Sequence, residues 1–278
     1  MYETQERGIQ VTEPQYRQIA EKLRADIRAG KWAPGQRLPS HAELAALYNV
    51  SVTTTRGAVS ELAKENLVFT ATSRGTIVRN RQILDHVVTD SIRPDRPRRS
   101  SADVFVETAE RAGRQAEKKF EMQIVPATPE VAGWLGIEPN SWVVARSLIQ
   151  SLDGEPWSWE ISHFPRDLAE ATGIDSPQDI PGGTMQRLRE RGYQETSFVH
   201  LEHARPASRE EAERLAVPIG TWITDFVRIA STGERITRAT RRRFAADRNR
   251  IIHELGDEQG LALIRNALNS ANDSARAH

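Results

Sequence analysis

Apolar positions near the start of the chain recur with the spacing of a helix. Residues three and four apart lie on one side of an α-helix, which is the spacing of Tyr16, Ile19, Leu23 and Ile27. Pro14 suits a first turn, and Gly30 suits the position that follows a last turn. The pattern predicts a helix over residues 14–29.

Capping residues predict two more helices. Ser40 and Glu43 have the spacing of a capping box, in which each side chain accepts a hydrogen bond from the backbone N–H of the other residue. Ser51 is placed to cap a third helix, which we expect to end near Asn66.

Beyond the third helix the pattern becomes that of a hairpin. Leu67-Val68-Phe69 and Thr76-Ile77-Val78 predict two short strands, and Ser73-Arg74-Gly75 forms the tip between them. Helices followed by such a hairpin form a winged helix-turn-helix, which offers one short helix to the major groove of DNA. We therefore expect a DNA-binding domain over residues 11–79.

Strands and helices are mixed in the second half of the chain. We expect helices over 104–112, 129–135, 184–190 and 209–215, and strands over 119–125, 142–151, 156–163, 198–204, 222–229 and 235–244. This mixture predicts an α/β ligand-binding domain over residues 102–255, and the fold class of the whole chain is then α+β. Residues 256–278 should form a C-terminal helix, over 261–268, and a tail.

The two expected domains are separated by a polar segment. Residues 80–101 end in Arg93-Pro94-Asp95-Arg96-Pro97-Arg98-Arg99. Such a composition is typical of a solvated linker.

Composition narrows the class of protein. The 278 residues include no cysteine, so disulfides, thiolate metal sites and cysteine nucleophiles are excluded. No apolar run approaches the ~20 residues of a membrane span, and the first residues lack the layout of a signal peptide. We expect a cytoplasmic protein with no membrane partner.

Charge is divided unevenly between the two halves. Residues 1–100 hold 16 Lys and Arg against 11 Asp and Glu, which leaves 22 against 27 for the remainder of the neutral chain. A basic first part and an acidic second part suit a DNA-binding domain carried by a body that does not contact phosphates.

Spaced motifs in the first eighty residues resemble those of the GntR family of bacterial transcription regulators. They are Pro14-x-Tyr16, Gly30-x-x-x-Pro34-Gly35-x-x-Leu38-Pro39-Ser40, Leu44-Ala45, Val50-Ser51-x-x-Thr54-x-Arg56 and Gly75-Thr76-Ile77-Val78. The second half resembles the UTRA effector domain of the HutC subfamily, which is chorismate-lyase-like. That resemblance rests on Leu135-Gly136, Arg146, Asp153-Gly154-Glu155-Pro156, Glu160, Phe164-Pro165 and Phe244-x-x-Asp247-Arg248.

The resemblance implies a function for each half. Family members bind inverted-repeat operators as homodimers and release them, or change their grip, when a small molecule enters the second domain. We therefore expect a ligand-responsive regulator that acts as a repressor. The alternative is a constitutive DNA-binding repressor whose second domain only dimerises.

By the same resemblance, the DNA contacts lie at the start of the second helix, on the third helix and at the hairpin tip. The expected residues are His41, Ser51, Val52, Thr53, Thr54, Thr55, Arg56, Arg74 and Gly75. Arg17, Lys31 and Arg37 are further candidates for phosphate contacts or are plain surface charges.

Two departures from the family pattern change the expected DNA sequence. Ala42 and Val52 stand where relatives usually carry arginines that read guanine, and each arginine–guanine pair is worth ~1–3 kcal/mol. We therefore expect Val52 and the threonines to read thymine, with His41 replacing one missing contact.

The resemblance also implies an effector pocket. Arg146 and Glu160 should face it from adjacent strands, and Arg238 and Thr240 from a third. Thr184 should either meet an anion at a helix N-terminus or cap that helix. Trp157 and Trp159, on one strand face with Glu155, are expected to line an apolar wall.

The expected ligand is not a sugar phosphate, although that is a common ligand in the subfamily. Leu148 stands where a second arginine is usual, and Arg238 stands where an acidic residue is usual. Together with the tryptophans, these changes favour a mostly apolar ligand that carries a carboxylate.

An enzyme is the main rival to a regulator. Some GntR relatives carry an aminotransferase-like domain that needs a lysine for pyridoxal phosphate, but every lysine here lies at or before Lys119. His200 and His203, three apart on an expected strand, would point to opposite faces and form no metal site. We expect no enzyme activity, no cofactor and no metal.

Overall fold

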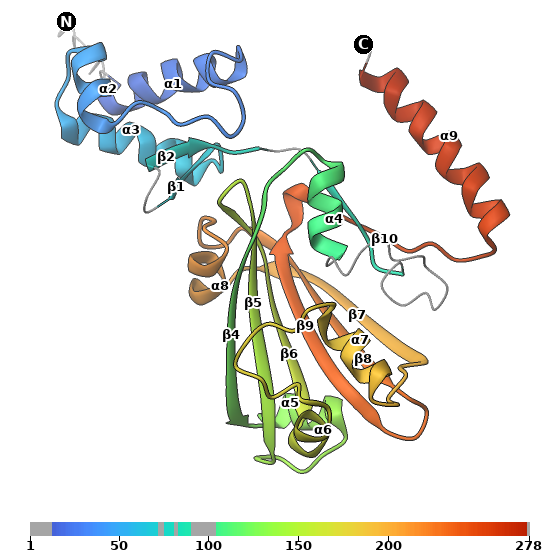
Figure 1. Cartoon of the computed structure of the whole chain (residues 1–278). Helices are drawn as coiled ribbons and strands as arrows, with labels where there is room; N and C mark the ends of the chain where they lie inside the picture. Colours follow the sequence, from blue (N-terminus) through green and yellow to red (C-terminus); the bar gives the residue numbers. More distant parts are fainter. Residues whose placement is uncertain (1–12, 72–74, 81–82, 90–103, 277–278) are drawn as a thin grey trace, which may run out of the picture.

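A computed structural model of the chain describes residues 13–71, 75–80, 83–89 and 104–276. Its N-terminal part, here called the head, contains α1 (Gln15–Arg28), α2 (His41–Tyr48), α3 (Val52–Lys64) and a hairpin of β1 (Val68–Ala71) and β2 (Gly75–Val78) (Figure 1). The predicted three helices and hairpin are confirmed.

Local capping sets the ends of the head's helices. The Ser40 Oγ accepts from the backbone N of Glu43 at 3.3 Å, and the Glu43 carboxylate accepts from the backbone N of Ser40 at 2.7 Å. The Ser51 Oγ accepts from the backbone N of Thr54 at 3.0 Å. One apolar cluster then joins the helices to the hairpin, with Leu23, Leu44, Leu62 and Val68 at its centre.

The C-terminal part, here called the body, is built on one antiparallel sheet of six strands in the order β4-β5-β6-β9-β8-β7. The strands are β4 (Ala116–Pro126), β5 (Trp142–Leu152), β6 (Glu155–Pro165), β7 (Ser197–Pro206), β8 (Trp222–Ser231) and β9 (Ile236–Ala245). Each predicted strand of the body is present. Five are longer than predicted because hydrogen-bonded pairing continues beyond the predicted ends, and β9 has the predicted length but is shifted by one residue.

Short helices cover both faces of the sheet. Val143 and Val144 point to opposite faces because side chains alternate along a strand. Val143 packs with α5 (Pro129–Leu135). Val144 packs with α6 (Arg166–Thr172) and α7 (Gly183–Glu190). The other helices of the body are α4 (Val104–Arg111), α8 (Arg209–Arg214) and the one-turn η2 (Ala246–Arg248).

The structure corrects the interpretation of the predicted linker. Within residues 80–101, β3 (Leu84–Val87) pairs in parallel with β10 (Asn249–Ile252). Leu84 and Val88 are buried in two clusters of the body. This part of the segment is therefore packed on the body and is not a solvated tether.

The chain ends in α9 (Glu258–Arg276), which is longer than the helix predicted over 261–268. Figure 1 shows it extending away from the sheet, with the C-terminus at its far end. Within the described ranges, no helix has the length and apolar character needed to cross a membrane.

Candidate DNA and effector sites

The first turns of α3 present a small exposed surface. Ser51, Thr53 and Arg56 are exposed, and Val52 is 39 % exposed although it is apolar. Thr54 is half-buried, and its hydroxyl lies 2.8 Å from the hydroxyl of Ser51. The structure thus brings five of the predicted DNA-contacting residues together at one end of one helix.

Thr55 does not belong to this surface, and its prediction as a DNA contact is wrong. Its side chain is fully buried. The hydroxyl donates to the carbonyl of Val52 at 2.8 Å and to the carbonyl of His41 at 3.1 Å. Because the second bond reaches the first residue of α2, Thr55 holds α2 against α3.

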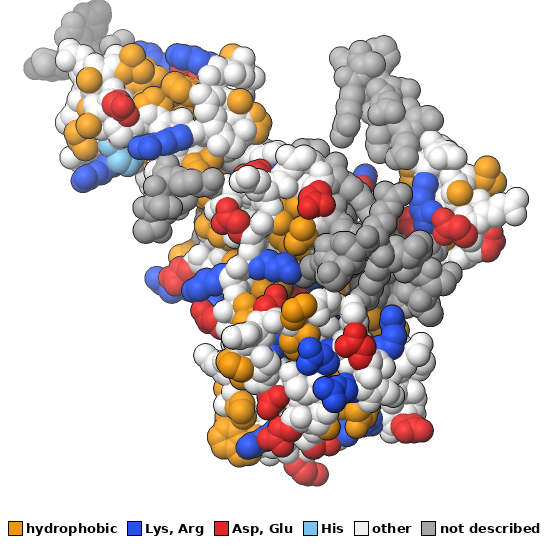
Figure 2. Space-filling view, in the orientation of Figure 1, with side chains coloured by type: hydrophobic (Ala, Val, Ile, Leu, Met, Phe, Trp, Pro, Cys, Tyr) orange, Lys and Arg blue, Asp and Glu red, His pale blue; other side chains and the backbone are white. Residues whose placement is uncertain are grey.

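One basic residue, Arg37, lies beside the hairpin. Gly75 has a φ of 78°, and a Cβ there would lie 3.2 Å from the Nε of Arg37. Arg37 is exposed, and its backbone bridges to Ile77 of β2. Arg74, the predicted contact at the tip, lies outside the described residues. Figure 2 shows basic side chains on several parts of the head.

A buried ion cluster joins the head to the body. Arg79, directly after β2, pairs with Glu155 and donates to the carbonyl of Ala216. Glu155 also pairs with Arg248, and the side chains of all three ionic residues are 2 % exposed. A second link runs from the Nδ2 of Asn66 to the carboxylate of Asp247, at 2.7 Å. Sequence reasoning missed these links because they join residues far apart in the chain.

Four polar residues lie side by side across the middle of the sheet. Arg146 lies opposite Ser162, Ser162 opposite Thr240, and Thr240 opposite Arg228. Opposite residues of paired strands point to the same face, and this is the face that α6 and α7 partly cover. We call these four residues the polar row. The hydroxyls of Ser162 and Thr240 are 2.8 Å apart.

Arg146 already has several partners within the chain. It is 5 % exposed and donates to the carbonyls of Ile174, Ser176 and Gln178 at 2.8, 2.9 and 3.1 Å. Burial lowers the pKa of its guanidinium. Its observed role is to hold the loop that follows α6 against the sheet.

The other charged candidates are paired as well. Arg238 donates to both carboxylate oxygens of Glu195, at 2.8 and 2.9 Å. The carboxylate of Glu160 accepts from the Nε of Arg242 at 2.7 Å. Adjacent to these pairs, Arg228 donates to the Nε2 of His200 at 2.9 Å and to the carbonyl of Val88 at 2.8 Å.

Positive charge predominates on this face. The polar row and its pairs hold four arginines, at 146, 228, 238 and 242, against three carboxylates, those of Glu160, Asp179 and Glu195. Burial, with Arg238 and Arg242 nearby, lowers the pKa of Arg228 to about 9. Burial and Arg242 likewise lower the pKa of His86, which stacks on Phe244 of β9, to about 4. Burial is the larger cause of both shifts, and the neighbouring arginines act in the same direction.

Thr184 lies in the first turn of α7, next to a pair of left-handed glycines. Gly182 and Gly183 have φ values of 78° and 80°. A Cβ on Gly182 would lie 2.4 Å from the Oε1 of Gln186, whereas a Cβ on Gly183 would meet nothing within 4 Å. Gly182 is the N-cap and supplies no side chain, so Thr184 does not act as the cap.

The structure does not bring Trp157 to the other predicted effector residues. Trp157 is fully buried in a cluster with Leu84, Phe105 and Leu152, whereas Trp159 belongs to a separate cluster under α8. The guanidinium groups of Arg114 and Arg248 lie 5.0 and 5.2 Å from the Trp157 ring. Both tryptophans are core residues, and the prediction that they form one apolar pocket wall is wrong.

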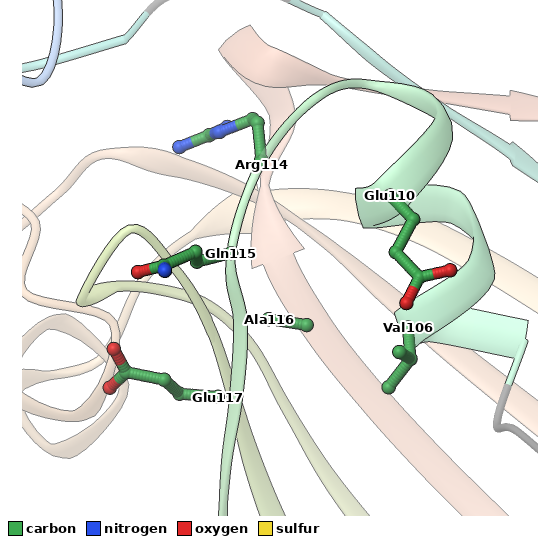
Figure 3. A pocket seen from close by; sticks show the side chains of 6 residues that line it. All are labelled: Val106, Glu110, Arg114, Gln115, Ala116 and Glu117. Carbon is green, nitrogen blue, oxygen red and sulfur yellow. The ribbon is translucent and has the colours of Figure 1, made fainter.

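An open hollow of about 460 Å³ lies between α4 and β4 (Figure 3), and it contains none of the predicted effector residues. Its lining residues are Val106, Glu110, Arg114, Gln115, Ala116 and Glu117. Arg114 pairs with Asp153 at 2.8 Å. With its two glutamates, this hollow does not suit an anion. No group of metal-ligating side chains occurs in the described part of the chain.

The chain was then compared with known proteins. Residues 15–78 match the family described as bacterial regulatory proteins, gntR family, and residues 112–250 match the UTRA domain. YurK of Bacillus subtilis, an uncharacterized HTH-type transcriptional regulator, is 27 % identical over 79 % of this chain and 86 % of its own length. NagR of Bacillus subtilis, an HTH-type transcriptional repressor, is 26 % identical over 72 % of each chain.

A solved structure shares the fold. PhnF from Mycobacterium smegmatis matches over 86 % of this chain and 100 % of its own, with a TM-score of 0.52 and 18 % identity.

Proposed function

Because this chain belongs to the GntR family of bacterial regulators and carries the UTRA domain of its HutC subfamily, we propose that it is a ligand-responsive repressor. Family membership makes it a DNA-binding transcription regulator and not an enzyme. The finer proposal is that a homodimer binds an inverted-repeat operator and releases it when a small molecule occupies the body. Support for repression comes from a relative that is named a repressor, NagR.

We propose that the exposed end of α3 reads the operator. An exposed valine at the start of a helix has no role in the core of the head, and its methyl groups suit the methyl of thymine. Val52, Thr53 and Arg56 would meet base edges, whereas Ser51 and the basic groups at 37 and 74 would meet phosphates. This exposed surface is the observation that carries the DNA-binding part of the proposal.

The effector is proposed to be an organic anion. The excess of arginines over carboxylates along the polar row supports a carboxylate on the ligand. Leu148 and Phe226 lie next to the row on the same face and support an apolar part. We propose Glu160, Thr240 and Arg238 as contacting residues, with Thr184 at the edge. Arg146 would act indirectly, by holding the loop after α6.

The pairing of the arginines on this face supports the alternative, a constitutive repressor. Arg146 already donates to three carbonyls and Arg238 to one carboxylate of the chain, so a ligand must displace these partners or use the remaining groups. A body with no effector, which only dimerises, would look the same. Regulated and constitutive repression therefore remain two proposals that an experiment must separate.

Footprinting of the purified protein on the DNA upstream of its own gene tests the DNA-binding part. We expect a protected inverted repeat, with affinity that falls steeply as salt rises, because phosphate contacts release counterions. Protection without sequence preference at every salt concentration would contradict a specific operator.

Thermal unfolding in the presence of small carboxylates separates the two proposals. A ligand that binds only the folded body raises the unfolding midpoint. The regulated proposal also requires that this compound weaken operator binding, because coupling between two sites is reciprocal. A midpoint shift that is lost in Thr240→Val, but kept in Thr232→Val, a half-buried control outside the polar row, would support binding at the polar row.

A further inference from the structure

The polar row ends in an arginine on each side, and each arginine donates to the backbone of a segment that covers the sheet. Arg146 donates to three carbonyls of the loop between α6 and α7. Arg228 donates to the carbonyl of Val88 at 2.8 Å, and Val88 directly follows β3. The row therefore holds one covering segment at each end, with Ser162 and Thr240 between the two arginines.

The segment that Arg228 holds leads directly to the head. Val88 is buried in a cluster with Phe226, and its backbone N donates to the carbonyl of Ile252 at 3.0 Å. Toward the N-terminus the same segment continues through β3 to Arg79 and the hairpin of the head. The loop that Arg146 holds joins only two helices of the body. Of the two ends of the polar row, only the Arg228 end is thus connected to the DNA-binding part.

Arg228 is placed so that an anion in the polar row competes with Val88 for its guanidinium. It lies opposite Thr240 and is 9 % exposed. Besides the carbonyl of Val88, the neutral Nε2 of His200 accepts from it at 2.9 Å. A carboxylate accepts two parallel hydrogen bonds from a guanidinium, which a single carbonyl cannot do. A carboxylate bound between Ser162 and Thr240 would therefore draw Arg228 toward the row and away from Val88.

We propose that Arg228 couples the polar row to the head, because an organic anion that pairs with Arg228 releases Val88 and loosens β3. This inference rests on the proposed function and gives its ligand response a route. Two heads of a dimer need a fixed spacing to reach both half-sites of an operator. A loosened β3 leaves that spacing less defined, so operator affinity falls although the reading helix is unchanged. Val88 lies between the ranges 15–78 and 112–250 that the two family models match.

Arg228→Met tests the coupling without a ligand, because methionine keeps an apolar stem and cannot donate. Hydrogen–deuterium exchange of the full-length protein, read by mass spectrometry, should be about ten-fold faster in peptides that cover residues 83–89. Peptides of β5 serve as the internal reference and should not change. Affinity for the footprinted operator, measured by fluorescence anisotropy, should fall by about five-fold or more.

Arg228→Lys keeps the charge but has one nitrogen in place of two donors, and it provides the test if Arg228→Met does not fold. It should change the exchange and the affinity in the same direction by smaller factors. Urea unfolding verifies that each variant is folded.

Two further arginines provide matched controls. Arg146→Met removes the guanidinium at the other end of the polar row, so exchange should become faster at residues 174–178 and not at residues 83–89. Arg235→Met removes an ion pair with Asp167 outside the row and should leave both exchange at residues 83–89 and operator affinity unchanged.

The outcome is separable from that of the proposed function. Unchanged exchange at residues 83–89 in the Arg228 variants would overturn the coupling, and so would faster exchange with unchanged operator affinity. In both cases an operator footprint of the unchanged protein would leave the regulator proposal standing. The absence of any operator protection by the unchanged protein would overturn both proposals.

Discussion

The head and the body place their candidate functional side chains in opposite ways. At the start of α3, Thr53 and Arg56 are exposed, with their helix held by its own cap. In the body, Arg146 and Arg238 are buried and paired with groups far along the chain. A substitution in the head can therefore change DNA contacts and leave the fold intact, whereas one in the body changes binding and folding together.

The largest effect is expected where the two regions meet. Glu155→Gln would leave Arg79 and Arg248 buried without their carboxylate. Removing one partner of a buried ion pair costs about 3–5 kcal/mol, and urea unfolding measures this loss in the free energy of unfolding. The control is Glu213→Gln, at an exposed position of α8, which should change the free energy of unfolding little. A loss below about 1 kcal/mol for Glu155→Gln would show that the cluster contributes little.

The next largest effect is expected on the base preference of the head, with no change in stability. Val52→Arg restores an arginine at an exposed position of α3 and should shift base preference toward guanine by about 1–3 kcal/mol in each half-site. A base-substitution scan of the footprinted operator measures the shift. If guanine already dominates the site facing Val52 in the unchanged protein, the prediction of thymine reading is wrong.

Acidification should weaken the body through its half-buried histidines. Burial, assisted by Arg243, lowers the pKa of His163 from 6.5 to about 4. As the pH falls through this window the unfolded chain binds a proton and the folded chain does not, so stability is lost. We expect His163→Gln to reduce the loss between pH 7 and pH 5 by about 1 kcal/mol, allowing for partial solvation.

Urea unfolding at the two pH values measures this difference. His203→Gln, on the exposed part of β7, is the matched control. The same pH dependence in His163→Gln as in the unchanged protein would contradict the assignment.

The smallest effect separates the two faces of α3. Thr55→Val removes hydrogen bonds to the carbonyls of His41 and Val52 and should cost about 1 kcal/mol of stability, with operator affinity unchanged well below the melting temperature. Thr53→Val, at an exposed position, should change operator affinity and not stability. Reversed results would place Thr55 at the DNA surface.

The sequence predicted those parts of the fold that local signals determine. Caps such as Ser40 and Ser51 mark helix starts, and alternating residues mark the six strands of the body. The pairing of β3 with β10 could not be predicted, since each strand has four residues, lies in polar sequence and finds its partner 165 residues away. The seven-residue α6 was missed because so short a helix has little periodicity.

The candidate sites could likewise be predicted only where local signals determine them. Family motifs located the exposed end of α3, but not which threonine faces inward, because that depends on how α2 packs on α3. In the body, no spacing links Arg146 to the carbonyl of Ile174 or Arg238 to Glu195. These are tertiary contacts, and they decide which charges are available to a ligand.

The links between head and body also imply an order of folding. Arg79, Asn66 and β3 find their partners at Glu155, Asp247 and β10, all made later in synthesis. The head has its own apolar core and can fold as soon as it leaves the ribosome. The head would then expose its DNA-reading helix before it is attached to the body. Its attachment would be complete only when β10, in the last part of the body, has been synthesised. A chain interrupted before residue 247 would thus carry a folded head that lacks two of its three attachments.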